Sequence, residues 1–331
     1  MIGVIIVTFQ SEKVIRACVE SLHNSSHREL RVVICDNNSR DGTLNVVKKW
    51  TVSQGVKLVE VHVGEVPDPC PYIFLHSGAN LGFAGGVNAG LSLLLEDKSV
   101  DLFWILNPDC EVLPNTASAF AECARQVYPF ALMGGRIRYH ETPQFLQSDG
   151  GVVSKWSGVC SNLNAGLLPS EAVMPSAEDL DFISGASMVA ARTFVERIGL
   201  MAEDYFLFYE EVDWASRRGG LPLVLCPEAV VLHHGGTSTG SGSINRRASP
   251  FTNYFNFRNR IRFMRRFYPL RLPIVWVLSV LRVFKLMLTG AFDEAAAAAR
   301  GICGMPPSTP VRNRIALVDR DLAFSTRETQ L

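Results

Sequence analysis

The sequence predicts an α/β protein with a mostly parallel, twisted β-sheet flanked by helices, followed by amphipathic helices toward the C-terminus. Three observations support this fold class: short apolar runs in the first third of the chain, helical periodicity between them, and long helical patterns after residue 250. The chain has 331 residues, of which 47% are hydrophobic. That is enough to fill the core of one large domain or two ordinary ones.

Four short apolar runs are typical of strands that are covered on both faces: residues 4–7, 32–35, 72–75 and 102–106. Between most of them lie helical patterns, such as Val14, Cys18 and Leu22 after an expected helix cap at Ser11. Alternating strands and helices predict a parallel sheet with right-handed crossovers over roughly residues 1–125. Ligands of such sheets lie at the carboxyl ends of the strands.

The next segment, from about 130 to 235, has a mixed pattern that we expect to extend the same sheet. "SDGGVVS" and "FISGASMVAA" indicate strand and turn, and "FYEEVDWASRRGG" indicates a helix closed by glycine. Residues 250–290 then predict two helices. The second carries Arg282 and Lys285, which favours a helix lying in a membrane surface over one that spans it. From Met305 to residue 331 we expect a flexible tail.

Charge is balanced overall but unevenly distributed. Lysine plus arginine and aspartate plus glutamate number 32 each, so no net field recruits nucleic acid. No acidic residue lies between Glu228 and Asp293, whereas that gap contains Arg246, Arg247, Arg258, Arg260, Arg262, Arg265, Arg266, Arg271, Arg282 and Lys285. This basic stretch predicts a solvated helix face, an anchor on an anionic membrane surface, or an interface in a homo-oligomer.

The eight cysteines are scattered without a Cys-x-x-Cys pair, which is typical of thiols in a reducing compartment. The first residues, "MIGVIIVTF", read as a strand and have none of the features of a secretory signal. We therefore expect a cytoplasmic protein.

Polar side chains follow three of the predicted strands. Thr8 follows the first, Asp36 the second, and Asp109, in "ILNPDC", the strand at 102–106. Because the carboxyl ends of parallel strands share one edge of the sheet, these side chains are expected to converge. The alternative for each is a local turn: Asp36 can start an Asx turn, and Asn-Pro-Asp forms a turn by itself.

Three further segments contain candidate chemistry. "NLGFAGGVNAG" (80–90) indicates close approach of backbone to a ligand or strand, but it lacks the spacing of dinucleotide and Walker loops. "YEEVDW" places Glu210, Glu211 and Asp213 in one turn, which predicts either a base with a raised pKa or a solvated acidic turn. In "VVLHHGGTST" the adjacent His233 and His234 point to opposite faces of a strand, so at most one of them faces a given site.

In this order, the segments resemble glycosyltransferase family 2, and most closely its bacterial rhamnosyltransferase-like members. The matching pieces are "VTF", "CDNNSRDGT", "NLGFAGGVNAG", "LNPD", "FISGASM", "DYFLFYEEVDWASRRGG" and "HHGGTST"; "NYFNFRNRIRFMRRFYP" and "AAAARGICG" are similar to the family's C-terminal helices. The resemblance implies a GT-A fold, with a catalytic domain at 1–240 that divides into a nucleotide-sugar-binding half (1–125) and an acceptor-binding half (126–240). A basic amphipathic helical region at 241–304 and the tail at 305–331 follow.

Carried over residue by residue, the resemblance implies three groups of site residues. The nucleotide-sugar site comprises Thr8, Phe9, Asp36, Asn38, Ser39, Asn80, Gly82, Phe83, Asn88, Asn107 and Asp109. The acceptor site comprises Ser184, Gly185, Ala186 and Arg217. Asp109 and His233 are the implied ligands of a divalent metal, Mg²⁺ or Mn²⁺, although Asn107 replaces the first aspartate of the family's Asp-x-Asp motif. Glu211 matches the family's base, and Glu210 and Asp213 are the other catalytic candidates.

The activity implied is inverting transfer of a sugar from a nucleoside-diphosphate sugar, with dTDP-L-rhamnose as the first guess. The acceptor would be a hydroxyl of a glycan or lipid-linked glycan in bacterial cell-surface polysaccharide synthesis, reached at the inner face of the plasma membrane. One alternative is a sugar nucleotidyltransferase, although "VTFQSEKVIRA" has no glycine in the loop where such enzymes are rich in it. Another alternative is a non-catalytic glycan-binding or scaffold protein with the same fold.

Overall fold

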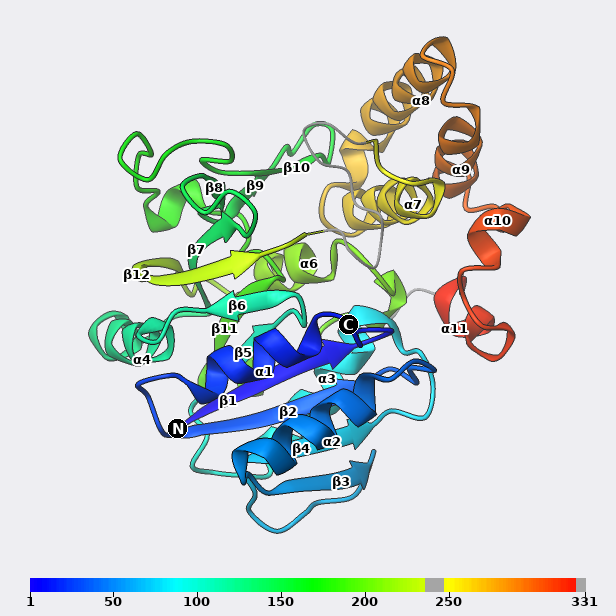
Figure 1. The fold of residues 1–331 in the computed structure, drawn as a ribbon. Coiled ribbons are helices and arrows are strands. Elements are labelled where there is room, and N and C mark those ends of the chain that lie inside the picture. The colour runs from blue at the N-terminus through cyan, green and yellow to red at the C-terminus, as the bar shows by residue number, and fades with distance from the viewer. Residues whose placement is uncertain (236–246, 326–331) are drawn as a thin grey trace.

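The computed structural model describes residues 1–235 and 247–325 (Figure 1). Residues 236–239 of the "HHGGTST" segment, Arg246, and residues 326–331 of the predicted tail lie outside the described residues.

A ten-stranded mixed sheet forms the centre of the molecule, with the strand order β3-β4-β2-β1-β5-β11-β7-β12-β6 and β8 paired to β7. Its strands are β1 (Ile2–Thr8), β2 (Leu30–Asp36), β3 (Leu58–His62), β4 (Tyr72–His76), β5 (Leu102–Leu106), β6 (Cys110–Val112), β7 (Leu132–Tyr139), β8 (Leu146–Ser148), β11 (Ser187–Ala191) and β12 (Leu223–His233). Strands β9 (Gly151–Val153) and β10 (Cys160–Asn162) form a separate antiparallel pair.

The N-terminal part of the sheet has the predicted parallel arrangement. β1 pairs in parallel with β2 and β5, and β4 pairs in parallel with β2 and β3. Every residue of β1 is buried, which explains the continuous apolar run from Ile2 to Val7. The helices between the strands are α1 (Ile15–His23), α2 (Thr43–Gln54) and α3 (Gly82–Leu95). In Figure 1, α1 and α2 lie in front of this part of the sheet and α3 lies behind it.

The first helix differs slightly from the prediction. Ile15, Cys18, Val19 and Leu22 form its buried stripe, as the periodicity predicts, but the N-cap residue is Val14. Ser11 lies outside α1, where its hydroxyl accepts a hydrogen bond from the Phe9 amide at 3.2 Å and so shapes the loop after β1.

Residues 130–235 extend the same sheet, as expected. β11 runs antiparallel between β5 and β7, and β12 pairs in parallel with β7 and antiparallel with β6. The helices of this region are α4 (Thr116–Val127), α5 (Arg192–Ile198) and α6 (Glu210–Ser216), and short 3₁₀ turns lie at η1 (Ala177–Asp179) and η2 (Glu203–Tyr205).

The C-terminal region is helical and stands at one end of the sheet (Figure 1). It comprises α7 (Pro250–Phe267), η3 (Pro269–Arg271), α8 (Leu272–Leu288), α9 (Phe292–Ile302), α10 (Thr309–Arg312), η4 (Leu317–Asp319) and α11 (Arg320–Ala323). No helix among the described residues is both long and apolar enough to cross a membrane.

The sequence-based prediction of a flexible tail from residue 305 is wrong for residues 309–323. Val311, Ile315 and Ala323 are buried in a small cluster with Phe251 and Phe255 of α7. The helices α10 and α11 have only four residues each, so the sequence shows no helical periodicity there. Their apolar side chains are nevertheless stabilised by covering the hydrophobic surface of α7.

Helix α7 is also not the surface helix that its arginines suggested. Arg258, Asn259 and Arg262 are buried, and the helix packs against α9 and donates hydrogen bonds to the segment before α6. The next helix, α8, has the opposite character, because only Val275 and Ser279 are buried in it. Within the described residues, the basic region at 241–304 therefore begins with an interior helix, α7, and an exposed helix, α8, and α9 follows them.

Candidate active site

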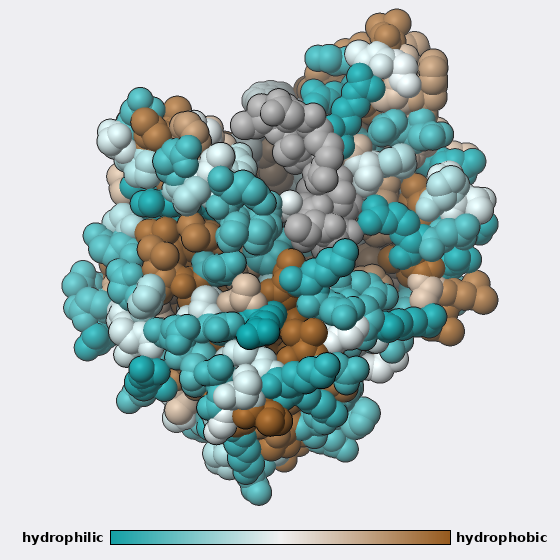
Figure 2. Space-filling view, in the orientation of Figure 1, coloured by the Kyte–Doolittle hydropathy of each residue, from teal (hydrophilic) through white to brown (hydrophobic). Residues whose placement is uncertain are grey.

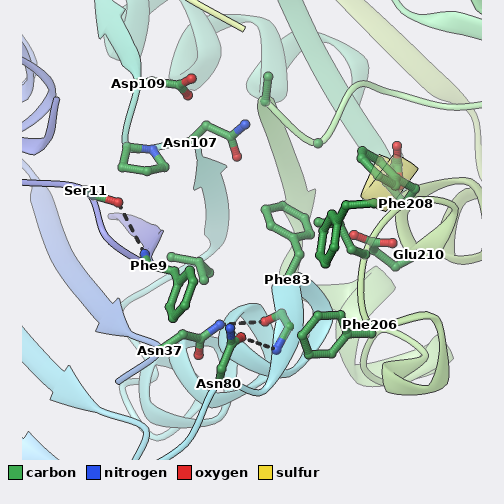
Figure 3. A pocket seen from close by; sticks show the side chains of 18 of the residues that line it. Phe9, Ser11, Asn37, Asn80, Phe83, Asn107, Asp109, Phe206, Phe208 and Glu210 are labelled. Atoms are coloured by element: carbon green, nitrogen blue, oxygen red, sulfur yellow. Dashed lines mark hydrogen bonds between the residues drawn. The ribbon is translucent and has the colours of Figure 1, made fainter. Parts of the chain in front are cut away.

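A cleft of about 330 Å³ opens where the carboxyl ends of β1, β2 and β5 meet the loop before α6 (Figure 3). Asp109 and Glu211 both line it. Separate surfaces for these two acids would have removed the enzyme hypothesis, and the structure instead places them in one cavity. In Figure 3 the side chains of Phe9, Asn107 and Asp109 lie on one side of the cleft, and Phe83, Phe208 and Glu210 lie on the other.

The loops after β1, β2 and β4 form one end of the cleft. Phe9, Asn37 and Asn80 line it, and the side-chain amide of Asn37 donates to the Gly82 carbonyl at 2.7 Å. The Gly82 amide in turn donates to the Asn80 side-chain oxygen at 3.1 Å. The bond from Asn37 joins the loop after β2 to the loop after β4, and the Asn37 side-chain oxygen is buried without a hydrogen-bond partner among the described residues.

Gly82 occupies a position that accepts no side chain. Its φ is +74°, and a Cβ there would lie 2.3 Å from the Phe206 carbonyl oxygen. The neighbouring Phe83 amide donates to that same carbonyl at 2.8 Å. Glycine therefore lets the first turn of α3 dock against the loop that leads into the acidic helix α6.

The Asn107-Pro108-Asp109 turn connects β5 to β6. The Asn107 amide donates to the Ala186 carbonyl at 2.9 Å, and the Cys110 amide donates to the Asn107 carbonyl at 3.1 Å. The turn is thus fixed at both ends, and it directs Asp109, which is only 8% exposed, toward the cleft. Both interpretations of this motif hold: it is a turn, and the turn presents a carboxylate.

Asp109, Cys110 and His233 place three potential metal-ligand atoms within 4.8 Å of one another. His233 Nε2 lies 3.3 Å from Asp109 Oδ1, and His233 Nδ1 lies 2.7 Å from Gln147 Oε1. A proton on Nδ1, donated to the Gln147 oxygen, leaves the Nε2 lone pair facing Asp109. The Cys110 thiol instead donates to the Ala186 carbonyl at 3.3 Å, and burial raises its pKa well above the ordinary value. Asp109 and His233 are therefore the two residues suited to hold a cation.

The opposite wall is a loop in an uncommon conformation. Phe206, Phe208 and Tyr209 have φ of 63°, 69° and 75°, backbone values that residues other than glycine seldom adopt. Phe206, Leu207 and Phe208 line the cleft, and the loop leads directly into Glu210 and Glu211.

Helix α7 holds this loop in place from behind. The Asn259 amide donates to the carbonyls of Tyr205, Leu207 and Phe208 at 2.9, 2.7 and 2.9 Å. Arg258 also donates to the Tyr205 carbonyl at 2.7 Å. Buried carbonyls that point away from regular structure need such donors, so α7 maintains the wall that carries the acidic pair.

The two glutamates that begin α6 have unusual acid–base properties. Burial raises the pKa of Glu211 to about 7. Burial, and then the neighbouring charge of Glu211, raise the pKa of Glu210 well above its ordinary value. Glu210 Oε2 has no hydrogen-bond partner among the described residues, whereas Glu211 is partly exposed in the cleft. A carboxylate with a pKa near neutrality, facing a cavity, is suited to accept a proton.

Most of the predicted site residues lie on the cleft wall. From the nucleotide-sugar group these are Phe9, Asn80, Gly82, Phe83, Asn107 and Asp109, and from the acceptor group Ser184, Gly185 and Ala186. Glu210, Glu211 and His233 also line the cleft.

Five residues of the predicted nucleotide-sugar group do not line the cleft. The Thr8 hydroxyl donates to Asp36 Oδ1 at 2.8 Å, and the Ser39 amide donates to Asp36 Oδ2 at 2.9 Å, so Asp36 fixes an Asx turn. Val7 and Asn37, their direct neighbours, line the cleft instead. Asn38 has φ of 60° in this turn, and Asn88 in α3 donates to the Met201 carbonyl at 2.9 Å.

Asp213 and Arg217 are structural rather than part of the cleft. Asp213 is fully buried and accepts from Arg217 at 2.7 Å, Arg266 at 2.6 Å and the Tyr205 hydroxyl at 3.0 Å. Arg217 also donates to the Leu200 carbonyl at 2.8 Å. Asp213 does not line the cleft, and the two arginines compensate its buried charge.

Sequence reasoning missed two parts of the cleft. One is the aromatic loop of Phe206 and Phe208, whose orientation depends on positive φ values. The other is the C-terminal contribution of Phe251, Arg314 and Ile315. Nothing in the local sequence marks these last three residues, because only the docking of α7 and the α10 segment brings them to the cavity.

Comparisons with known proteins relate the chain to glycosyltransferases. Residues 3–145 match the family model described as glycosyl transferase family 2. The chain is 25% identical over 284 residues to the N-acetylglucosaminyl-diphospho-decaprenol L-rhamnosyltransferase of Mycobacterium tuberculosis, covering 78% of this chain and 83% of that protein. It is 24% identical over 244 residues to the low-salt glycan biosynthesis hexosyltransferase Agl10 of Haloferax volcanii, covering 70% and 74%.

Two solved structures share the fold. One is the mannosyltransferase PcManGT from Pyrobaculum calidifontis in complex with GDP-Man and Mn²⁺ (TM-score 0.52, 14% identity, 98% of this chain and 85% of that one). The other is S. aureus TarS 1-349 in complex with UDP (TM-score 0.52, 15% identity, 97% and 85%). The chain is therefore a glycosyltransferase with the GT-A fold; its residues 3–145 are similar to glycosyltransferase family 2, and the chain resembles rhamnosyltransferase-like relatives.

Proposed function

We propose that this protein is an inverting glycosyltransferase that moves a sugar from a nucleoside-diphosphate sugar to a hydroxyl of a glycan or lipid-linked glycan. The observation that carries the proposal is the shared cleft. Asp109 and His233 lie in it as a pair suited to a cation, and Glu211, with its raised pKa, lies in the same cavity.

Glu211 is the proposed base. In its ionised form it takes the proton of the acceptor hydroxyl, and that oxygen forms a bond to the anomeric carbon of the donor sugar. The bond from the anomeric carbon to the diphosphate oxygen breaks on the opposite side, and the nucleoside diphosphate leaves with the bonding electrons. Glu210, whose pKa is raised further by burial, stays protonated and adds no second negative charge beside the base.

Asp109 and His233 are the proposed ligands of Mg²⁺ or Mn²⁺. Their carboxylate and imidazole atoms converge, and the tautomer of His233 is set by Gln147, so the residues present fit a divalent ion. Such an ion, when bound, neutralises charge on the diphosphate. The PcManGT complex contains Mn²⁺ together with a nucleotide sugar, which supports this assignment.

The donor is proposed to be dTDP-L-rhamnose, and the acceptor a lipid-linked glycan. The rhamnosyl group and the lipid-linked acceptor are supported by the M. tuberculosis relative, which is named as an N-acetylglucosaminyl-diphospho-decaprenol L-rhamnosyltransferase. The nucleoside end would lie against Phe9, Asn37 and Asn80, where an aromatic ring and two amides meet. Residues 1–125 would then bind the donor, and residues 126–240 would contribute the acceptor wall.

A Glu211→Gln variant tests the base. We expect transfer to fall by about 10²–10⁴-fold because the amide accepts no proton, while stabilisation by nucleoside diphosphates in a thermal-shift assay persists. Glu196→Gln, at an exposed position of α5, is the matched control and should retain activity. Near-normal turnover of Glu211→Gln would reject the assignment.

The same glutamate predicts two pH effects of opposite direction. The base works ionised, so the transfer rate should fall as pH drops below about 7. In the folded protein the pKa lies above its ordinary value of 4.5, so the folded state binds more protons. The free energy of unfolding should therefore decrease as pH rises from about 4.5 through about 7, and Glu211→Gln should weaken that dependence.

A panel of nucleotide sugars identifies the donor. Thermal shift and transfer would be measured for dTDP-L-rhamnose, UDP-galactofuranose, UDP-N-acetylglucosamine and a deoxyamino sugar nucleotide, each with Mg²⁺, with Mn²⁺ and with chelator. Selective stabilisation and transfer with dTDP-L-rhamnose supports the proposed donor. Stabilisation without transfer to any glycan would favour a binding or scaffold role.

Helix α8 is the proposed contact with the inner face of the bacterial plasma membrane. Trp276, Leu281, Phe284 and Leu288 are among its large side chains that are 39–87% exposed. Figure 2 shows apolar residues on the projecting end of the molecule where α8 lies. An exposed apolar helix that also carries Arg282 and Lys285, without acidic residues, is suited to anionic lipid. Sedimentation with anionic vesicles tests this contact.

A further inference from the structure

Of the adjacent histidines His233 and His234, only His233 lines the cleft. His234 follows His233 directly at the end of β12, and neighbouring residues of a strand point to opposite sides. His140 occupies the corresponding position at the end of the adjacent strand β7, and its amide donates to the His233 carbonyl at 3.1 Å. Glu111 lies in β6, on the other side of β12.

We propose that Glu111, His140 and His234 form a second metal site, for a transition-metal ion such as Zn²⁺, separate from the pair Asp109 and His233. One potential ligand atom from each of these three residues lies within 4.8 Å of the other two. The three side chains come from neighbouring strands in the order β7, β12, β6, so one ion would connect three strand ends.

The distances suit shared coordination. Glu111 Oε1 lies 2.9 Å from His140 Nε2. Two ligand atoms that are each about 2.1 Å from one ion, at an angle of 90–110°, lie about 3–3.4 Å apart. A small outward movement of these two atoms would therefore admit an ion between them.

His234 already has the partner that a metal-binding histidine needs. Its Nδ1 lies 3.0 Å from Glu141 Oε1, so a proton on Nδ1 is donated to that carboxylate and Nε2 keeps its lone pair. The rings of His140 and His234 stack with centroids 3.6 Å apart, so the two imidazoles lie side by side. Coordination requires the rings to open from the present 24° interplanar angle.

The donor set distinguishes the two sites. Two imidazoles and a carboxylate suit Zn²⁺, Co²⁺ and similar ions, whereas Mg²⁺ and Mn²⁺ prefer oxygen ligands. Glu111, His140 and His234 are all partly exposed, so an ion can enter from solvent and water can complete its coordination. Glu111 and His234 lie close in sequence to Asp109 and His233. The bound ion would therefore stabilise the strand ends that carry these two proposed ligands of the first metal site.

The test is metal binding by the full-length protein in an Asp109→Asn background, which weakens the catalytic pair. After removal of metal by chelator, Co²⁺ is titrated and followed by its visible absorption, and Zn²⁺ by calorimetry. We expect one site per chain, a higher melting temperature with Zn²⁺, and an affinity at least tenfold lower after His140→Ala or Glu111→Gln.

The chain provides a matched control in Glu60, His62 and His76. These residues also come from neighbouring strands, with His rings stacked at 5.1 Å and His76 Nε2 3.2 Å from Glu60 Oε2. Within the described residues, their ligand atoms do not form a convergent group of three. His76→Ala should therefore leave Co²⁺ affinity unchanged.

Two results would overturn the proposal: no Co²⁺ or Zn²⁺ binding in the Asp109→Asn background, or equal affinity in the His140→Ala and His76→Ala variants. Circular dichroism of the metal-free variants checks folding, and Glu111→Gln provides a second variant if His140→Ala unfolds. Neither readout uses glycosyl transfer, so failure here is distinguishable from failure of the proposed function.

Discussion

Helices α7 and α8 are consecutive and both basic, yet the structure uses them in opposite ways. The arginine- and asparagine-rich α7 is largely buried, whereas the strongly apolar α8 is largely exposed. In α7, Arg258 and Asn259 donate to carbonyls of the loop that forms the cleft wall, and Arg266 pairs with Asp204 and Asp213. In α8, Arg282 and Lys285 lie on the outside.

The difference shows that available partners, rather than hydropathy, decide burial here. A buried guanidinium is stable where carbonyls and carboxylates surround it, and an apolar side chain is stable at a surface only where something apolar covers it. The count of ten cations thus overstates the charge that this region presents to a membrane. Only the exposed cations can serve there, and the following variants test that division.

The largest expected effect is on α7. Arg266→Met should lower the free energy of unfolding by about 3 kcal/mol, because it removes the guanidinium that pairs with the buried carboxylates of both Asp204 and Asp213. Arg265→Met, at the exposed neighbouring position, is the control and should change stability by at most about 0.5 kcal/mol. Urea denaturation measures both, and equal effects would contradict the interior role of Arg266.

Asn259→Ala should lower stability by about 2 kcal/mol, because three carbonyls lose one buried donor. It should also lower kcat, since the loop that leads into Glu211 loses its support. Asn253→Ala, in the first turn of the same helix, is the control, because its amide donates to Ala248 away from the cleft. An unchanged kcat in Asn259→Ala would separate the loop from catalysis.

On α8 the effect should appear in membrane binding alone. Leu281→Ser with Phe284→Ser changes two side chains that are 59% and 57% exposed, so stability should change by at most about 0.5 kcal/mol. Binding to anionic vesicles should weaken by about 100-fold or more. If the double variant instead dissociates an oligomer and binds vesicles normally, α8 is an interface between copies of the chain.

The smallest effect is expected from the exposed cations. Arg282→Gln with Lys285→Gln should weaken vesicle binding by about 1 kcal/mol per charge, about fivefold each. The loss should vanish with neutral vesicles and diminish at high salt. Equal loss with neutral vesicles would show that the charges do not meet lipid headgroups.

Much of the nucleotide-sugar half could be predicted from the sequence. Its strands are buried on both faces and therefore read as apolar runs, and parallel topology places Asp109 near the loops after β1 and β2 without knowledge of side chains. The opposed directions of His233 and His234 follow from strand geometry in the same way, and the two histidines indeed meet different partners.

The remainder depends on tertiary contacts that no local pattern encodes. Asp213 resembles Glu210 and Glu211 in sequence but pairs with Arg217, four residues along the chain, and with Arg266, which only the docking of α7 brings to it. Thr8 and Asp36 are direct neighbours of Val7 and Asn37, yet only Val7 and Asn37 line the cleft, whereas Thr8 and Asp36 hydrogen-bond to each other.

The walls of the cleft extend from Val7 to Ile315, a separation of 308 positions along the chain. Contacts between such distant segments form late in folding, because the intervening chain must first be ordered. Substrate binding would therefore report completion of folding, not merely formation of the sheet. A nucleotide sugar bound in the cleft would stabilise the docking of the C-terminal segment against the N-terminal sheet.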